Sequence, residues 1–212
     1  MRRTREEAEQ ARQELLTTAL RCYAERGINQ VSLKAIAAEA GVTHGAFYWH
    51  FKNRDDLLIA LAQSMDLPFE QHLIDQLQAI DQDALAALTH FLIDVTNDIL
   101  FDPHAQQVYN LLYSRQQMLP QNDELMALLS ENREEWMGYI NRFLKQARKQ
   151  KQLRKKTRSL PLAEMLFGEM QGVLAVCDSL HPDVPESEKR LITQLTFENT
   201  IRGLMAELRS SR

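Results

Sequence analysis

The stretch from Ser32 to Phe51 constrains the fold of this chain more than any other part of the sequence. It contains two signals for the start of a helix, Ser32 and Thr43, because both are residue types that cap helix N-termini. A single glycine, Gly41, stands between the two predicted helices, so the connection between them is short. Two short helices joined by a tight turn predict a helix-turn-helix.

The second helix of this pair carries more polar and aromatic side chains than a helix can bury. We expect Phe47 and Phe51 to lie in the core and Tyr48 to contact DNA, whereas Trp49 fits packing and phosphate contact about equally well. A unit this small cannot enclose its own apolar face, so it must rest on other helices and present its second helix outward. In helix-turn-helix proteins that helix enters the major groove, so double-stranded DNA is the expected partner.

Positive charge is concentrated where this interpretation needs it. The whole chain has a formal net charge of −4, but residues 1–54 hold nine of its Lys and Arg residues against six Glu, a net charge of +3. Binding to phosphates requires a local positive surface rather than a positive protein. We therefore predict that residues 1–54 carry the salt dependence of DNA binding.

The rest of the chain predicts helices throughout, since it has only seven glycines and six prolines over 212 residues. A first helix is expected from about residue 5 to 26, with Gly27 as a left-handed residue at its end. A long helix is expected from Asn53 to about Leu77, kinked at Pro68. Further helices are predicted at 83–100, around 104–112, at 124–150, at 162–180 and at 186–208, with a solvated basic connector at 149–158 that closes at Pro161.

The last two predicted helices are expected to form a homodimer interface. The helix at 186–208 has two apolar stripes, one with Leu191 and Leu195 and the other with Phe197 and Ile201. A helix that is apolar on two sides has two surfaces to cover. One side can face its own chain, and a second copy related by two-fold symmetry is the simplest cover for the other.

Several classes of protein are disfavoured by what the sequence lacks. It has no apolar run after its basic N-terminal residues and no stretch of 18 apolar residues, which predicts no signal peptide and no membrane span. Cys22 and Cys177 sit in apolar helical patterns and are expected to be buried free thiols. No nucleophile elbow, phosphate-binding loop or zinc-protease motif occurs, and no histidine or acidic residues have metal-ligand spacing. We therefore expect no enzyme activity, no cofactor and no metal.

Residues 12–58 resemble the DNA-binding head of the TetR family of transcriptional regulators. The run G-V-T-x-G-x-x-Y-x-H-F-x-x-x-x-x-L, from Gly41 to Leu57, is highly specific to that family. The N-terminal R-R-T-R-E-E-A-E-Q-A-R-Q and the segment A-F-Y-W-H-F-K-N look most like the branch that represses multidrug efflux pumps, the AcrR-like branch. The resemblance covers about a quarter of the chain strongly, and the helical remainder fits the family in architecture only.

The resemblance implies a set of DNA-binding residues. The second helix would contribute contacts to phosphates or the groove, the recognition helix would face the bases, and the residues after it would mainly hold the backbone. His44 departs from the branch, in which arginine is common at this place, so a bidentate contact to guanine is not expected. The set is Ser32, Lys34, Thr43, His44, Gly45, Tyr48, Trp49, His50 and Lys52.

A family-type effector pocket would need an apolar cavity with a few polar groups. The candidate lining residues are polar and aromatic side chains beside the apolar stripes of the later helices, although core packing or ordinary surface also explains each one. They are Phe91, Asn97, Tyr109, Asn110, Tyr113, Gln116, Trp136, Phe167 and Gln171.

The sequence thus predicts an all-α, cytoplasmic homodimer. A three-helix DNA-binding head is expected at residues 1–52, and a larger body for ligand binding and dimerisation at residues 53–212. The expected function is repression at a palindromic operator, released by a small hydrophobic effector, with control of an efflux pump as one possibility. Two alternatives stay open: a ligand-independent architectural or cell-division DNA-binding protein on the same scaffold, and a small helical enzyme or ligand carrier.

Overall fold

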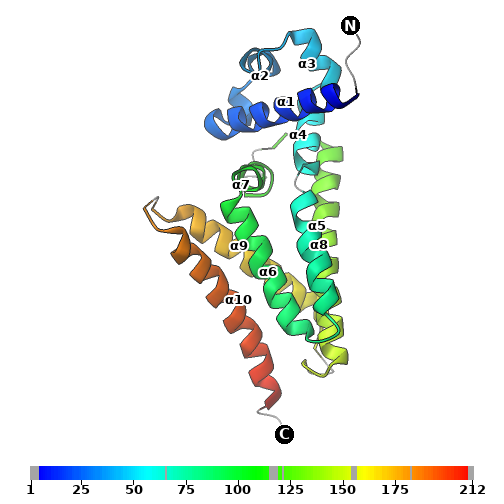
Figure 1. The fold of residues 1–212 in the computed structure, drawn as a ribbon, viewed down its shortest axis with the longest axis vertical. Helices are drawn as coiled ribbons and strands as arrows, with labels where there is room; N and C mark the ends of the chain where they lie inside the picture. Colours follow the sequence, from blue (N-terminus) through cyan, green and yellow to red (C-terminus); the bar gives the residue numbers. More distant parts are fainter. Residues whose placement is uncertain are drawn as a thin grey trace. The chain divides into compact units, whose positions relative to one another are not determined.

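The computed structural model describes residues 5–209 except 65, 115–118, 121, 154–156 and 182. Within these residues every regular element is a helix, so the all-α prediction is confirmed (Figure 1). The chain packs into two compact units, one made of Met1–Asp66 with His104–Leu129 and the other of Leu67–Pro103 with Ser130–Arg212. These units are defined by packing and do not test where the domains divide. The predicted domain boundary between residues 52 and 53 therefore stays a prediction.

The first unit contains the predicted helix-turn-helix. Helix α1 packs against α2 and α4, and α2 packs against α3. Its elements are α1 (Arg5–Arg26), the 3-10 helix η1 (Ile28–Gln30), α2 (Leu33–Glu39), α3 (His44–His50), α4 (Arg54–Gln63), α7 (Pro103–Tyr109) and the π-helical turn η2 (Asn110–Ser114). Helix α8 (Asp123–Lys149) begins in this unit and continues into the second.

Three side-chain caps define the helix starts of the head. The Ser32 hydroxyl accepts a hydrogen bond from the backbone N–H of Ala35 at 3.1 Å, and the Thr43 hydroxyl accepts one from Ala46 at 3.2 Å. Asn53 caps α4 in the same way. Each cap satisfies a backbone donor that would otherwise have no partner inside the helix. All three predicted caps are confirmed.

Gly41 produces the turn between α2 and α3. Its φ is +68°, in the left-handed region that favours glycine. The N–H of Gly41 donates to the Ala38 carbonyl, and the N–H of Val42 donates to the Ala37 carbonyl at 3.0 Å. These two bonds form the Schellman arrangement that ends a helix. Gly27 also has a positive φ, of +83°, but its ψ of 148° is extended rather than left-handed helical.

The second unit is a set of long helices. Helix α10 packs against α6 and α9, and α6 packs against α9. Its elements are α5 (Asp66–Ala79), α6 (Ala84–Phe101), most of α8, α9 (Ser159–Ser179) and α10 (Glu186–Arg209). The side chains of Phe91, Phe143 and Phe197 are fully buried in it.

Two predicted helix boundaries are wrong. One long helix was expected from Asn53 to Leu77, yet α4 ends at Gln63 and α5 begins at Asp66. Ser64 ends α4, since its hydroxyl donates to the Leu61 carbonyl at 2.7 Å. Pro68 is the third residue of α5 rather than an interior residue of one long helix, and the first turn of a helix needs no backbone donor at that position. For the same reason α9 begins at Ser159, before Pro161 rather than after it.

The connector after α8 has a structural role that the sequence did not reveal. The side-chain oxygen of Gln150 accepts from the backbone N–H of Ala84 at 2.9 Å, and that of Gln152 accepts from Leu85 at 3.2 Å. Both glutamines therefore satisfy donors in the first turn of α6. Gln150 also donates to the Ile80 carbonyl, so this end of α8 is fastened to the start of α6.

Helices α6 and α9 are long and apolar enough to cross a membrane by length and composition alone. Of the apolar windows, 61% of that in α6 and 44% of that in α9 is buried within the protein. Because the two helices pack against each other and against α10, the buried part of each window is explained as core, whereas Leu160, Met165 and Val176 of α9 are exposed.

Candidate nucleic-acid interface

Helix α3 divides its side chains sharply between the core and the surface. Phe47 is 0% exposed and Phe51 is 1% exposed, as predicted. On the other side, Tyr48 is 39% exposed and Trp49 is 73% exposed. A tryptophan this exposed contributes little to the stability of its own chain, so α3 carries aromatic side chains on its outer surface.

The exposed rings of α3 are arranged in pairs. The ring centroids of His44 and Tyr48 lie 4.5 Å apart with the planes tilted by 52°, one helical turn along the same face. Those of Trp49 and His50 lie 4.6 Å apart at a right angle. Contact with a neighbouring ring restricts each side chain, so the outward surface of α3 is partly ordered before any partner binds.

The other predicted DNA-binding residues lie on or beside this surface. Within the set, His50 alone is half-buried, and the remaining members are exposed. The hydroxyls of Ser32 and Thr43 accept hydrogen bonds as caps, which leaves each O–H able to donate to a phosphate. At Gly45, no described atom lies within 4 Å of the place where a Cβ would be. Packing inside this chain therefore does not require a glycine there.

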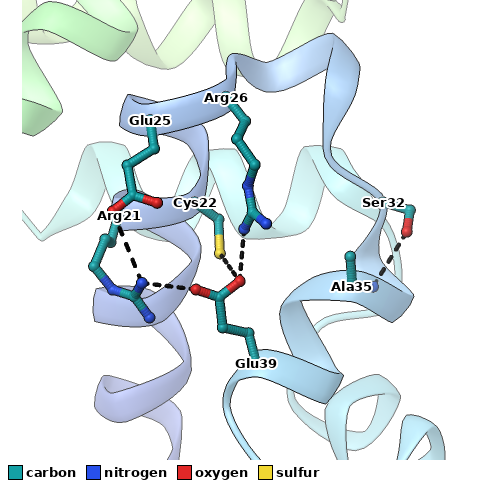
Figure 2. A network of polar contacts seen from close by, with 7 residues as sticks. All are labelled: Arg21, Cys22, Glu25, Arg26, Ser32, Ala35 and Glu39. Carbon is teal, nitrogen blue, oxygen red and sulfur yellow. Dashed lines mark hydrogen bonds and ion pairs between the residues drawn. The ribbon is translucent and has the colours of Figure 1, made fainter.

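Glu39 joins α1 to α2 through a cluster of polar contacts that sequence reasoning missed (Figure 2). Arg21 and Arg26 of α1 each donate to its carboxylate at 2.6 Å, and the thiol of Cys22 donates to it at 3.3 Å. The hydrogen bonds from Arg26, Cys22 and Arg21 lower the pKa of Glu39 to about 2. Burial, followed by the contact with Glu39, raises the pKa of the Cys22 thiol, which stays protonated as a donor.

This cluster changes which cations are available to DNA. Arg21 and Arg26 are committed to Glu39, and the guanidinium of Arg54 donates to the Val31 carbonyl at 3.1 Å. Lys34 and Lys52 are exposed, and within the described residues neither ammonium group forms an ion pair. The local positive charge that can reach phosphates is therefore carried by fewer residues than the sequence suggests.

No group of three or more His, Cys, Asp or Glu side chains in the described part of the chain is placed to hold a metal ion. Cys22 and Cys177 are free and buried, as predicted. The geometry of α3 suits binding through hydrogen bonds, ring contacts and charge.

The predicted effector residues do not all lie in one unit. Phe91, Asn97, Trp136, Phe167 and Gln171 belong to the second unit, and Tyr109, Asn110 and Tyr113 belong to the first, whereas Gln116 lies outside the described residues. The structure brings together Phe91 with Trp136, at 5.8 Å between ring centroids, and Tyr109 with Tyr113, at 5.9 Å. Gln171 is exposed.

Two of these residues, Asn97 and Phe167, have distinctive surroundings. The side-chain oxygen of Asn97 is buried and has no hydrogen-bond partner in the described structure. A buried acceptor left unpaired is costly, so it marks a place where a donor would be stabilising. Phe167 is nearly buried, and the guanidinium of Arg133 lies over its ring at 5.5 Å.

Residues 15–61 match the family model described as bacterial regulatory proteins, tetR family. This stretch contains the whole helix-turn-helix and most of α1 and α4. The HTH-type transcriptional regulator TtgR of Pseudomonas putida is 34% identical to this chain over 116 residues, which are 54% of this chain and 55% of TtgR. The chain therefore spans about half the length of this curated relative.

Solved structures extend the similarity along the chain. NalD, the secondary repressor of the MexAB-OprM multidrug efflux pump in Pseudomonas aeruginosa, superposes with a TM-score of 0.74 at 23% identity and covers 93% of this chain and 98% of its own. SmeT of Stenotrophomonas maltophilia, solved with triclosan, superposes with a TM-score of 0.74 at 25% identity over 91% of this chain and 90% of its own. The family motif and the matched head identify residues 15–61 as a TetR-family DNA-binding head, and the rest of the chain shares its helical fold with solved multidrug-efflux repressors.

Proposed function

We propose that this chain is a transcriptional repressor that binds double-stranded DNA through the outward face of α3. The observation that carries the proposal is the exposed row of Thr43, His44, Tyr48 and Trp49 on the second helix of a helix-turn-helix. These side chains combine hydrogen-bond donors and acceptors with flat rings, which suits base edges and phosphates in the major groove.

The core of the head supports this role by fixing α3 in place. The buried rings of Phe47 and Phe51 anchor α3 in the core of the head. Gly41 forms the turn before α3, and Glu39 connects α2 to α1. A recognition helix that is fixed in this way loses little conformational entropy when it binds. Lys34 and Lys52 flank α3 and would contact phosphates, whose neutralisation makes the affinity salt-dependent.

The dimer is proposed to form through α9 and α10. Six large hydrophobic side chains on these two helices are exposed to solvent in the single chain, namely Leu160, Met165, Val176, Leu191, Leu195 and Met205. Aliphatic surface of this kind is typical of an interface between identical subunits. A two-fold pair would present two copies of α3 to successive major grooves about 34 Å apart on a palindromic operator.

Release from DNA is proposed to follow binding of a small hydrophobic effector. The orphaned acceptor of Asn97 and the aromatic pair of Phe91 and Trp136 support a ligand site among the helices of the second unit. SmeT was solved with triclosan, an apolar aromatic compound, which favours the same ligand class here. An effector that moves the operator-competent fraction from 99% to 1% must prefer the released state by about 5.5 kcal/mol.

The same proposal includes a domain boundary, a cellular location and a regulated operon. Residues 1–52 would be the DNA-binding head and residues 53–212 the regulatory body of a cytoplasmic regulator. Solved structures named as efflux-pump repressors, NalD and SmeT, favour an efflux operon as the regulated target.

Selection of genomic fragments by the purified protein tests the proposed function. The expected result is recovery of a fragment with a palindromic site, bound with an affinity that falls steeply as salt rises. Binding to all fragments alike would instead support an architectural DNA-binding protein, and no salt-dependent binding at all would exclude both.

A further inference from the structure

A pocket of about 290 Å³ lies within the first unit, beside the DNA-binding head. The end of α1 and the 3-10 helix η1 form one wall, through Tyr23, Ile28 and Asn29. The other wall comes from α7 and η2, through Gln107, Asn110 and Leu111. Its volume lies just below the range of about 300–1,000 Å³ that drug-sized ligand pockets occupy, so it suits a small ligand.

The chemistry of the lining is neutral and amphipathic. None of the nine described residues that line the pocket is charged. Burial is the main cause that raises the pKa of Tyr23 to about 12, so its phenol also stays neutral. Apolar groups from Tyr23, Ile28 and Leu111 alternate with side-chain amides from η1, α7 and η2. Such a pocket suits a flat apolar body with neutral hydrogen-bonding groups, and it does not compensate a charged ligand.

Amide groups are available in the pocket. The side-chain amides of Asn29, Gln30 and Gln107 have no hydrogen-bond partner within the described chain. They stand on both walls, so one small ligand can reach donors and acceptors from each side. Asn110 is the one predicted effector residue that lines this pocket.

The pocket is placed to influence the recognition helix. Gln30, at the end of η1, is separated only by Val31 from Ser32, the cap of α2. On the opposite wall the backbone leaves α-helical geometry at Asn110 and forms a π-helical turn. Single π-helical turns are frequently found at functional sites. A ligand wedged between these walls would therefore act on the segment that positions α2 and α3.

We propose that this pocket binds a small neutral aromatic compound carrying an amide or a similar uncharged polar group, and that its occupancy weakens operator binding. The DNA part of this inference rests on the proposed function, whereas ligand binding itself does not.

A covalent occupant tests the coupling. In an Ala24→Cys variant, benzyl methanethiosulfonate would attach a neutral aromatic group to a residue that lines the pocket. Cys22 and Cys177 are both 0% exposed, so labelling is selective for the introduced thiol. We expect the labelled protein to bind operator DNA at least tenfold more weakly than the unlabelled variant, with recovery when dithiothreitol removes the label.

A matched control uses the same chemistry on the same exposed side of α1. Thr17→Cys places a thiol on an exposed position two turns before Ala24 and away from the pocket. Its labelled form is expected to keep its operator affinity within twofold. The coupling would be overturned if labelled Ala24→Cys bound the operator within twofold of its unlabelled form. It would also be overturned if the label reduced operator affinity equally at both positions.

A free probe tests the site without DNA. Benzamide should cause saturable NMR shifts at Tyr23 and Gln107 of the wild-type protein, and the charged counterpart benzoate should cause none at equal concentration. Leu111→Trp, which fills the pocket, should abolish the benzamide shifts. No saturable response to benzamide at millimolar concentration overturns the site, and an equal response to benzoate overturns its ligand class. These readouts stand even if the wild type binds no operator, a result that would overturn only the proposed function.

Discussion

Helix α3 and the pair α9–α10 both expose large hydrophobic side chains, but the chemistry of the two surfaces differs. On α3 the exposed residues are Tyr48 and Trp49, rings with polar atoms, among hydroxyl, imidazole and ammonium groups. On α9 and α10 they are aliphatic or thioether side chains such as Leu191 and Leu195. Rings with polar edges suit bases and phosphates, whereas aliphatic stripes suit a second apolar surface. The two surfaces share exposure, and their side-chain chemistry indicates which kind of partner each would suit.

Alanine substitutions of a buried and an exposed residue on α3 should give the largest difference in stability. Phe47→Ala removes a ring that is 0% exposed, so it should destabilise the head by about 3–5 kcal/mol. Urea unfolding followed by circular dichroism measures this change. Trp49→Ala, at a position 73% exposed, is the matched control and should change stability by less than about 0.5 kcal/mol. Similar losses in both variants would mean that α3 has no distinct outer face.

A charge on the aliphatic stripe should separate the two surfaces. Leu191→Glu places a carboxylate where the proposed dimer is apolar, so sedimentation should show monomers and operator affinity should fall by about 100-fold. Ile74→Glu on α5 makes the same change at an equally exposed side chain, 50% against 48%. It should leave the dimer intact. If Ile74→Glu rather than Leu191→Glu dissociates the protein, the dimer surface has been assigned to the wrong helices.

Thr43 both caps α3 and lies on its exposed surface, so its substitution should affect stability and operator binding together. Thr43→Ala removes the hydroxyl that accepts from Ala46, which should cost about 1 kcal/mol in unfolding free energy and also weaken operator binding. Thr43→Ser keeps the hydroxyl and should behave like the wild type in thermal melts. A serine variant as unstable as the alanine variant would show that the methyl group, not the cap, is the important part.

The Glu39 cluster predicts a pH effect confined to the head. The pKa of Glu39 is about 2 in the folded protein against a usual value of 4.5, so its stabilising contribution is fully present above about pH 4.5. It is lost as the pH falls from there towards 2. Glu39→Gln should therefore weaken the pH dependence of the unfolding free energy in this range. A variant with the same pH profile as the wild type would show that the Glu39 cluster does not stabilise the head.

The local features of the head were readable from the sequence, and the long-range ones were not. Ser32, Thr43 and Asn53 act on backbone groups three residues away, so their residue types and spacing predict the caps directly. The contacts of Glu39 with Arg21 and Arg26 span 18 and 13 residues, and those of Gln150 and Gln152 with α6 span more than 60. No sequence period marks such pairs, because they depend on how helices pack.

The prediction of one helix across the boundary between α4 and α5 was wrong for a different reason. Apolar spacing continues on both sides of Ser64, so the pattern favoured one helix with a kink at Pro68. The structure uses a serine cap to end α4 and places the proline in a first turn. Proline therefore indicated a helix start here, and the apolar period could not distinguish one helix from two.

Operator titration with the Tyr48→Ala variant tests the central claim most directly. Fluorescence anisotropy at fixed salt would compare wild type and variant on the selected palindromic fragment, with circular dichroism to confirm equal folding. The account predicts a loss of affinity of about tenfold or more, since Tyr48 lies on the outer face of α3. A folded variant that binds within twofold of the wild type would contradict the assignment of α3 as the recognition helix.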